Sequence, residues 1–324
     1  MSGRRAQLGL VALALITLLA WPQQGSADHG NAITAFSGPF PHFAPLFIAD
    51  AKGFFKKHGV NATVRLFDSG GAASAAFRGG RADFLAGCDF PTISLLQVED
   101  AIVLGPIEHD TDSIMISARD GIPALKDLKG KKVGIPPRST SEFFTFRALK
   151  DVGLGPKDVE VVNLGPADML PALVRGDIDV ASWWQPFGWR AEEASGGKVK
   201  TLVTAKGYYT LWCPISARRA YVEAHPKETV ATLKALLDAV QWLNQVTLDE
   251  RAAAVTEYAK SDPKTTKQLM ALLTYDMTET ADYRTSMKEM EEFMLKAGLI
   301  RKAVEWDKVW GTRYLREVNP ALVK

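Results

Sequence analysis

The sequence predicts an α/β protein built from two doubly wound lobes. The main observation is a motif that occurs twice, 96 residues apart: a glycine turn, then an aspartate three residues later, then an apolar strand. Gly80 and Asp83 belong to the first copy, and Gly176 and Asp179 to the second. The strands upstream, 63–67 and 159–163, repeat at the same spacing. Ligands of α/β folds collect at the carboxyl ends of strands, so we expect a binding cleft where two such edges face each other.

Residues 1–27 are typical of an export signal. Arg4 and Arg5 precede an apolar run at 8–20, and the small residues 25–27 suit cleavage near Ala27. An uncleaved membrane anchor is the alternative, because the apolar run is marginal for spanning a bilayer. We expect cleavage and a periplasmic protein, with the export route open.

The first half of the chain alternates short strands with helices. The turn-rich stretch 37–42 follows the first strand, and Gly53 ends the first helix. Gly87–Pro91 form a loop after the third strand, while the charged residues Glu108–Asp112 are interpreted as a solvated loop. Strands are expected at 33–36, 62–66, 84–86, 101–104 and 113–117, and helices at 44–52 and after residue 70.

The second lobe is expected after a break at Asp120–Pro123. Its apolar stretch 211–217 should return to the first lobe as a strand. From Pro226, which suits a helix start, apolar residues recur at three- and four-residue spacing and predict helices packed on the core. In between, strands are expected at 133–135, 159–163 and 178–183, and helices at 142–152 and 167–175.

Charge balance excludes several kinds of partner. The 324 residues include 39 Lys+Arg and 37 Asp+Glu, and residues 1–27 hold two arginines and no acid, so the remaining 297 carry 37 of each. The balanced charge gives no reason to expect that the protein binds nucleic acid or an anionic membrane surface. This length suffices for two domains with cores. Cys88 and Cys213 either pair, as exported cysteines often do, or stay buried thiols.

Common catalytic and metal-binding motifs are absent from the sequence. There is no His-Glu-x-x-His, Cys-x-x-Cys, Gly-x-Ser-x-Gly or phosphate-binding loop, and the five histidines show no ligand spacing. We therefore expect no metal and no cofactor. Glu108, His109 and Cys88 remain the candidates for an enzyme on this fold, the alternative of a different class.

Taken in order, several segments resemble the periplasmic solute-binding proteins of ABC importers, in the nitrate, sulfonate and taurine family. The similarity covers roughly residues 33–245. It rests on 43–49 with Gly53-Phe54-Phe55, on 67–70, on Gly80-x-x-Asp83, on 125–133, on Ser139-Thr140, on Gly176-x-Ile178-Asp179 and on His225-Pro226.

The resemblance implies a type II periplasmic binding fold with a two-strand hinge and carboxy-terminal helices. The first lobe would comprise 28–117 and 213–324, and the second 118–212. A small solute would be held between the lobes, which close on it. The implied partners are an ABC permease and its ATPase at the membrane, and the protein would be a monomer.

Two helix starts offer anion sites. The amides and hydroxyls of Ser139–Ser141, like Ser69–Gly71 in the first lobe, would present the positive end of a helix dipole to a sulfonate, nitrate or carboxylate. Ordinary capping is the alternative for these serines. Neighbouring strand residues face opposite sides, so one of Trp183 and Trp184 should face the cleft, and Trp184 is favoured.

The favoured solute is a sulfonate-like organic anion. Residues 211–214 contain no carboxylate, which argues against taurine, whereas Asp89 and Glu142 leave open a thiamine-precursor pyrimidine or another nitrogen heterocycle, stacked on aromatic rings. The predicted solute-binding residues are Pro39, Phe40, His42, Ser69, Gly70, Gly71, Cys88, Asp89, Ser139, Thr140, Ser141, Glu142, Trp184, Gln185 and Tyr208.

Overall fold

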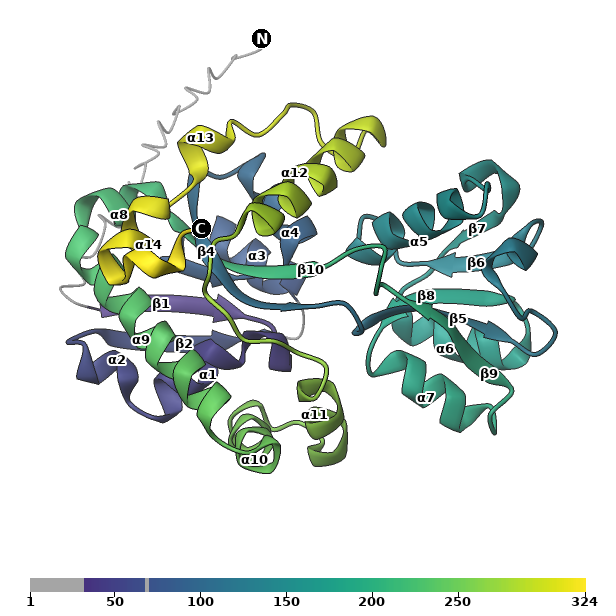
Figure 1. The fold of residues 1–324 in the computed structure, drawn as a ribbon, viewed down its shortest axis with the longest axis horizontal. Coiled ribbons are helices and arrows are strands. Elements are labelled where there is room, and N and C mark those ends of the chain that lie inside the picture. The colour runs from purple at the N-terminus through teal and green to yellow at the C-terminus, as the bar shows by residue number, and fades with distance from the viewer. Residues whose placement is uncertain (1–31, 68–69) are drawn as a thin grey trace, which may run out of the picture. The chain divides into compact units, whose positions relative to one another are not determined.

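The computed structural model describes residues 32–67 and 70–324, and these form two five-stranded sheets with helices around them (Figure 1). The predicted export signal and Ser69 lie outside the described residues. The prediction of two α/β lobes is confirmed.

The first sheet has the strand order β2-β1-β3-β10-β4. Strand β1 pairs in parallel with β2 and β3, whereas β10 is antiparallel to both of its neighbours. The strands are β1 (Ala32–Ser37), β2 (Asn61–Leu66), β3 (Phe84–Ala86), β4 (Ala101–Asp110) and β10 (Leu211–Arg218).

The second sheet repeats this topology in the order β7-β6-β8-β5-β9. Strand β6 pairs in parallel with β7 and β8, and β5 is antiparallel to β8 and β9. The strands are β5 (Ile114–Arg119), β6 (Lys132–Ile135), β7 (Glu160–Asn163), β8 (Val180–Trp184) and β9 (Val199–Thr204).

The repeated motif occupies the same place in both sheets. Gly80 and Gly176 have φ of +75° and +91°, a backbone that glycine adopts without strain. The carbonyls of Asp83 and Asp179 accept hydrogen bonds from Arg218 N and Arg119 N of the antiparallel strands. The Asp179 carboxylate accepts from Lys132 N, whereas Asp177 pairs with the side chain of Arg175.

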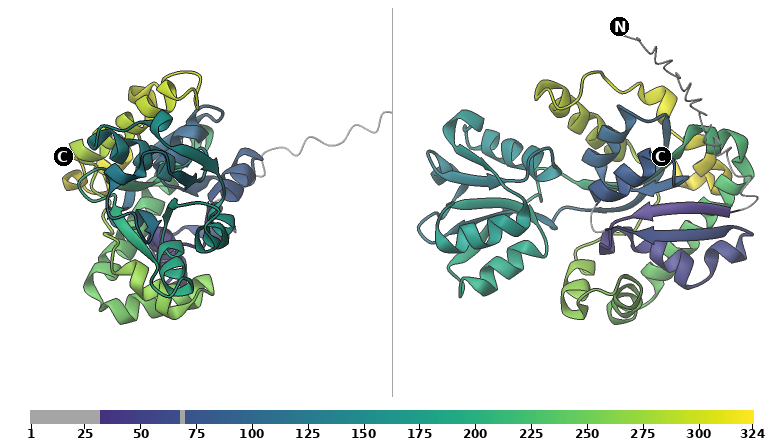
Figure 2. Two further views of the ribbon diagram at one scale, coloured as in Figure 1. Left: turned by 90° about the vertical axis from the view of Figure 1, so that its right-hand side faces the viewer. Right: turned by 180° about the vertical axis from the view of Figure 1, so that it is seen from behind.

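Helices α5 (Thr140–Asp151), α6 (Pro166–Arg175) and α7 (Phe187–Ala194) cover the second sheet. Helix α5 packs on one face, and α6 and α7 pack together on the other, as the front and back views both show (Figures 1 and 2). This is the doubly wound arrangement expected from alternating strands and helices.

The first lobe carries the remaining helices. Helix α9, twenty residues long, packs on α1 and α14, and α12 packs on α4 (Figure 1). Pro226 begins α9, as predicted. The helices are α1 (Ala44–Ala51), α2 (Phe54–Lys57), α3 (Gly70–Arg78), α4 (Asp89–Leu96), α8 (Arg219–Ala224), α9 (Pro226–Gln245), α10 (Leu248–Ala259), α11 (Pro263–Met270), α12 (Ala281–Lys296), α13 (Trp306–Val309) and α14 (Thr312–Val318).

The chain passes between the two sheets twice, through 111–113 and 205–210. The predicted divisions at 118 and 213 fall inside β5 and β10, which belong to the second and the first sheet respectively. The exact lobe boundaries stay a prediction. No helix among the described residues has the length and apolar character needed to cross a membrane.

Three local expectations are wrong. Glu108–Asp110 are not an exposed loop but the end of β4, and Glu108 is fully buried. Asp89, expected in a loop, is the first residue of α4. Helix α7 and strand β9 were not expected at all, although β9 completes the second sheet.

Candidate functional site

A cavity of about 270 Å³ lies at the carboxyl ends of β1, β3, β6 and β8. This is where α/β folds bind ligands. Two larger hollows, of about 370 and 380 Å³, are lined largely by charged surface side chains such as Lys52 and Lys302, so they are poorer candidates. The cavity is lined by Phe40, His42, Phe43, Gly87, Cys88, Phe90, Pro91, Ser113, Ile114, Arg138, Ser139, Thr140, Trp184 and Leu211.

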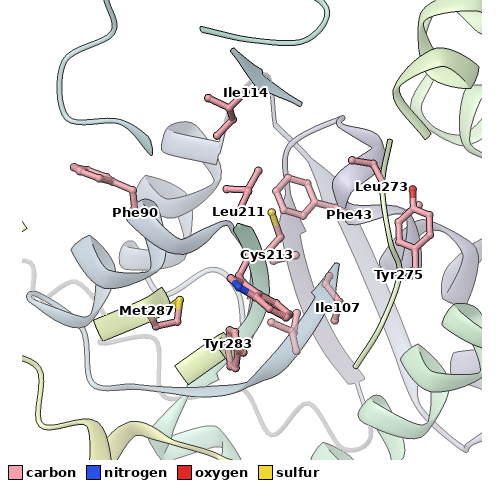
Figure 3. Close-up of a cluster of buried hydrophobic side chains, with 14 of the residues drawn as sticks. Phe43, Phe90, Ile107, Ile114, Leu211, Cys213, Leu273, Tyr275, Tyr283 and Met287 are labelled. Atoms are coloured by element: carbon pink, nitrogen blue, oxygen red, sulfur yellow. The ribbon is translucent and has the colours of Figure 1, made fainter. Parts of the chain in front are cut away.

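The first lobe supplies an apolar wall with two polar groups. Phe43 and Phe90 are buried and Leu211 begins β10 (Figure 3). His42 lies in the 3-10 helix η1 (Pro41–Phe43), and its Nε2 is 3.3 Å from Ser113 Oγ. The cavity therefore combines aromatic surface with a few fixed polar atoms, as small-molecule sites do.

The second lobe supplies the start of α5. Ser139 is its N-cap and accepts from Glu142 N at 3.3 Å, so the capping alternative is real for this serine. Arg138 is the only arginine or lysine among the described residues that line the cavity. A guanidinium beside a helix N-terminus suits an anion.

Asp89 lies just behind this cavity and joins the two lobes. Its Oδ1 accepts from Thr140 Oγ1 at 3.0 Å and from Phe90 N at 2.6 Å. Burial raises the pKa of Asp89 to about 7, although the hydrogen bonds from Phe90, Thr140 and Trp212 act in the opposite direction. The carboxyl therefore titrates near neutral pH.

A second acidic group lies beside His42. Glu108 and Asp110 stand opposite Cys213 and Leu211 in the β4–β10 ladder, so their side chains share a face with these residues. Burial, followed by the charges of Asp110 and Asp89, raises the pKa of Glu108 well above its usual value. His42 Nε2 lies 3.6 Å from Asp110 Oδ2.

Of the predicted site residues, the structure brings six together around the cavity. These are Phe40, His42, Cys88, Ser139, Thr140 and Trp184. Asp89 is next to them through its bond to Thr140. Trp184 lines the cavity, whereas Trp183 is fully buried and donates from Nε1 to Ser117 Oγ.

Among the residues that the structure describes, Pro39, Ser141, Glu142, Gln185 and Tyr208 do not line the cavity. Gly70 and Gly71 begin α3, and Pro39 precedes Phe40. The carbonyl of Ser141, a buried residue, accepts from Thr145 and Ser182.

Three further predicted side chains make contacts within the second lobe. Glu142 accepts from Arg138 N at 2.8 Å. Gln185 accepts from Trp189 N. Tyr208 packs edge-on against Phe144, with ring centroids 6.0 Å apart.

Sequence reasoning missed Arg138, Ser113 and the apolar wall. Arg138 directly precedes Ser139, so its place in the same loop was the available signal. Ser113 follows the acidic run of β4, and no local pattern points to it. Phe43, Phe90, Ile114 and Leu211 are apolar residues of ordinary appearance in sequence, and only tertiary packing brings them together.

The groups suggested for catalysis are not arranged as an active site. Cys88 is joined to Cys213 in a disulfide, so it offers no thiolate. His109 alternates with Glu108 along β4 and packs on Trp212, with centroids 4.5 Å apart. Glu108 and His109 therefore lie on opposite faces of the sheet.

Two α/β lobes, two chain crossings and a cavity between strand ends are the architecture of the type II periplasmic solute-binding fold. The chain belongs to the NMT1-like family, whose model matches residues 37–259. The predicted similarity to the nitrate, sulfonate and taurine family is confirmed, as the sulfonate- and taurine-binding proteins below show.

A Bacillus subtilis protein, provisionally named as aliphatic sulfonates-binding, is 28% identical to this chain over 312 residues. The match covers 87% of this chain and 91% of that protein. The taurine-binding periplasmic protein of Escherichia coli is 29% identical over 218 residues, 62% of this chain and 66% of that protein. The solved aliphatic sulphonate binding protein SsuA from Escherichia coli has a TM-score of 0.74 at 19% identity, covering 86% of this chain and 91% of that chain.

Proposed function

We propose that this chain is the extracytoplasmic solute-binding component of an ABC importer, and that it captures a small organic anion, with a sulfonate as the first candidate. The solute would lie in the cavity between the lobes and be delivered to a membrane permease driven by its ATPase. The binding proteins among its relatives support the class of protein.

The observation that carries the proposal is the α5 end of the cavity. Arg138, Ser139 and Thr140 line a space of about 270 Å³ with a guanidinium, two hydroxyls and a helix N-terminus. Each side chain also donates within the protein, to Leu299 O, Pro136 O and Asp89 Oδ1 respectively, so a solute would share or replace these acceptors. Hydrogen bonds from such donors to an anion are charge-assisted and fix its orientation. The aromatic wall would take the apolar part of an alkanesulfonate.

Taurine returns to the candidate solutes. The argument against it was that residues 211–214 hold no carboxylate for its ammonium group. However, β4 brings Glu108 opposite Cys213, and Asp89 Oδ2 lies 3.5 Å from Trp212 N. Glu108 and Asp89 thus lie beside the return strand, next to the cavity and not in its lining, and this position supports taurine as a candidate.

A pyrimidine or other nitrogen heterocycle is the second candidate. Phe40, Phe43, Phe90 and Trp184 offer ring faces at the cavity, and Asp89 offers an acceptor close by. Such a solute would depend on Asp89 more than on Arg138, so the two candidates make different demands on the same site.

We propose binding without turnover, a periplasmic location and a monomeric protein. The absence of a Cys88 thiol and the separation of Glu108 from His109 argue against the catalytic alternative. The disulfide supports an oxidising compartment, since disulfides persist there.

Calorimetric titration of protein freed of ligand by unfolding and refolding tests the proposal. Alkanesulfonates, taurine, nitrate and an aminopyrimidine would be compared. Arg138→Gln should weaken sulfonate binding by roughly ten- to a hundredfold, because a hydrogen bond to a charged group contributes about 1.5–3 kcal/mol. The matched control is Arg147→Gln. Arg147 lies in α5, pairs with Glu289 and does not line the cavity, so this variant should bind normally.

Binding of none of these solutes, or turnover of any of them, would overturn the transport proposal. Tight pyrimidine binding that survives Arg138→Gln but is lost in Asp89→Asn would instead select the second candidate.

A further inference from the structure

We propose that His42, Glu108 and Asp110 bind a divalent transition-metal ion, with Zn²⁺ as the first candidate, beside the solute cavity. The three residues come from η1 and the end of β4, and all are buried. Among the described residues, these three form the group of His, Cys, Asp or Glu side chains whose ligand atoms lie close enough together to bind one ion.

The distances suit a single ion. One ligand atom from each residue lies within 4.8 Å of the other two, and His42 Nε2 is 3.6 Å from Asp110 Oδ2. Two ligands at about 2.0–2.2 Å from a tetrahedral Zn²⁺ lie roughly 3.4 Å apart. The histidine and the aspartate therefore already have the required separation, and Glu108 needs only a small side-chain movement.

Glu108 provides the independent observation that a ligand is expected here. It is fully buried, and neither of its carboxylate oxygens has a hydrogen-bond partner within residues 32–67 and 70–324. None of the ion pairs found there involves Glu108 either. A buried, unpaired carboxylate is costly, and a bound cation would pair with one Glu108 oxygen and balance the charges of Glu108 and Asp110.

The surrounding contacts hold the other two ligands in place. Asp110 Oδ1 accepts from Ser113 N at 2.6 Å and Asp112 N at 2.8 Å, and its Oδ2 accepts from Ser113 Oγ. Tyr275 donates to the carbonyl of Pro41, next to His42. Such outer contacts orient metal ligands and strengthen metal binding.

The donor set and its position select the kind of metal. One imidazole with two carboxylates favours Zn²⁺ and similar ions over Mg²⁺ and Ca²⁺, which prefer oxygen ligands alone. Three protein ligands leave a coordination position open. Because His42 and Ser113 line the cavity, that position is within reach of a solute oxygen.

Zinc binding to the full-length mature protein, stripped with a chelator and kept free of solute, tests this proposal. We expect about one zinc per chain by elemental analysis after equilibrium dialysis, and a rise in melting temperature with zinc but not with magnesium or calcium. Glu108→Gln should weaken zinc affinity by at least about tenfold through loss of one of three ligands. Because glutamine has nearly the same size and shape as the side chain that it replaces, this variant should melt close to the metal-free wild type.

The matched control is His58→Gln. His58 pairs with Asp238 at the surface, so it offers a histidine–carboxylate pair without a third ligand, and its loss should leave zinc binding unchanged. Equal zinc binding by wild type, Glu108→Gln and His42→Gln would overturn the proposal, as would no zinc bound to the wild type. In the latter case Glu108 is held neutral by a proton. The zinc-binding experiment contains no solute, so its outcome is independent of the solute-binding proposal.

Discussion

Trp183 and Trp184 are neighbours in β8, but their side chains have different surroundings. Trp183 is fully buried and its Nε1 donates to Ser117 Oγ, while Trp184 is partly exposed and lines the cavity. The difference follows from the alternation of side chains along a strand.

Replacing each tryptophan should therefore have a different effect. Trp183→Ala should lower the free energy of unfolding by about 3–5 kcal/mol, because it removes a large buried side chain. Trp184→Ala should mainly weaken solute binding and abolish the fluorescence change on solute addition. Urea unfolding and calorimetric titration measure the two effects, and similar losses of stability and affinity in both variants would contradict this assignment.

Asp89 should make the protein less stable as pH rises from about 4 to about 7. Its folded-state pKa of about 7 lies above the ordinary value of 3.8, so the folded protein binds the proton more tightly than the unfolded chain. The stabilisation is complete below pH 4, is lost between these values and is absent above them. The shift corresponds to at most roughly 4 kcal/mol.

Urea unfolding of metal-free protein across this pH range checks the effect. Asp89→Asn should flatten the decline, leaving the part that comes from Glu108, whose pKa is raised in the same direction. An unchanged pH dependence in Asp89→Asn would show that Asp89 ionises normally in the folded protein.

For single residues, the sequence predicted those site residues whose role depends on their immediate neighbours in the chain. Ser139 and Thr140 were identified because a serine before a helix marks the helix start. Glu108 was misjudged because acids in series suggest a solvated loop, and its burial depends on β10, which arrives from residues 211–218. The His42–Asp110 contact joins positions 68 apart, so no ligand spacing could reveal it.

Helix α5 shows how one element serves stability and binding with adjacent residues. Ser139 caps the helix by accepting from Glu142 N, while Thr140 donates across to Asp89 of the other lobe. The first bond stabilises the helix in any arrangement of the lobes, and the second exists only when the lobes are together.

Two single substitutions separate these roles. Ser139→Ala should cost about 1 kcal/mol of unfolding free energy, the usual value of a lost N-cap. Thr140→Val should leave the urea midpoint nearly unchanged but weaken solute binding by roughly fivefold, as a neutral hydrogen bond contributes about 1 kcal/mol. The idea fails if Thr140→Val destabilises the fold while its affinity for solute stays at the wild-type value.

Elements with a strong period or turn signal were predicted, and those without one were missed. The glycine turns at 80 and 176 and the proline at 226 mark real boundaries. Helix α4 starts with Asp89-Phe90-Pro91, which suggests a loop, although proline is tolerated in a first turn. Strand β9 is short and half-exposed, and it is defined mainly by its pairing with β5.

In the whole molecule, the disulfide encloses the entire second lobe. Cys88 precedes α4 and Cys213 lies in β10, both in the first lobe, and every strand of the second sheet falls between them. The link therefore joins the chain at a point before it leaves the first lobe to one just after it returns. Sequence left this pairing open, because the 125-residue separation of the two cysteines says nothing about their distance in space.

Removing this link should destabilise the whole protein. A closed loop of 125 residues restricts the unfolded chain strongly, and losing a native disulfide of this kind typically costs about 2–5 kcal/mol. We expect Cys88→Ala/Cys213→Ala to lower the urea midpoint by a corresponding amount at unchanged secondary structure. Dithiothreitol should lower the midpoint of the wild type to a similar level and have no effect on the double variant, which controls for other actions of the reductant. Equal stability of the wild type with and without reductant would mean that the bond does not form in the folded protein, and the argument for an oxidising compartment would lose its support.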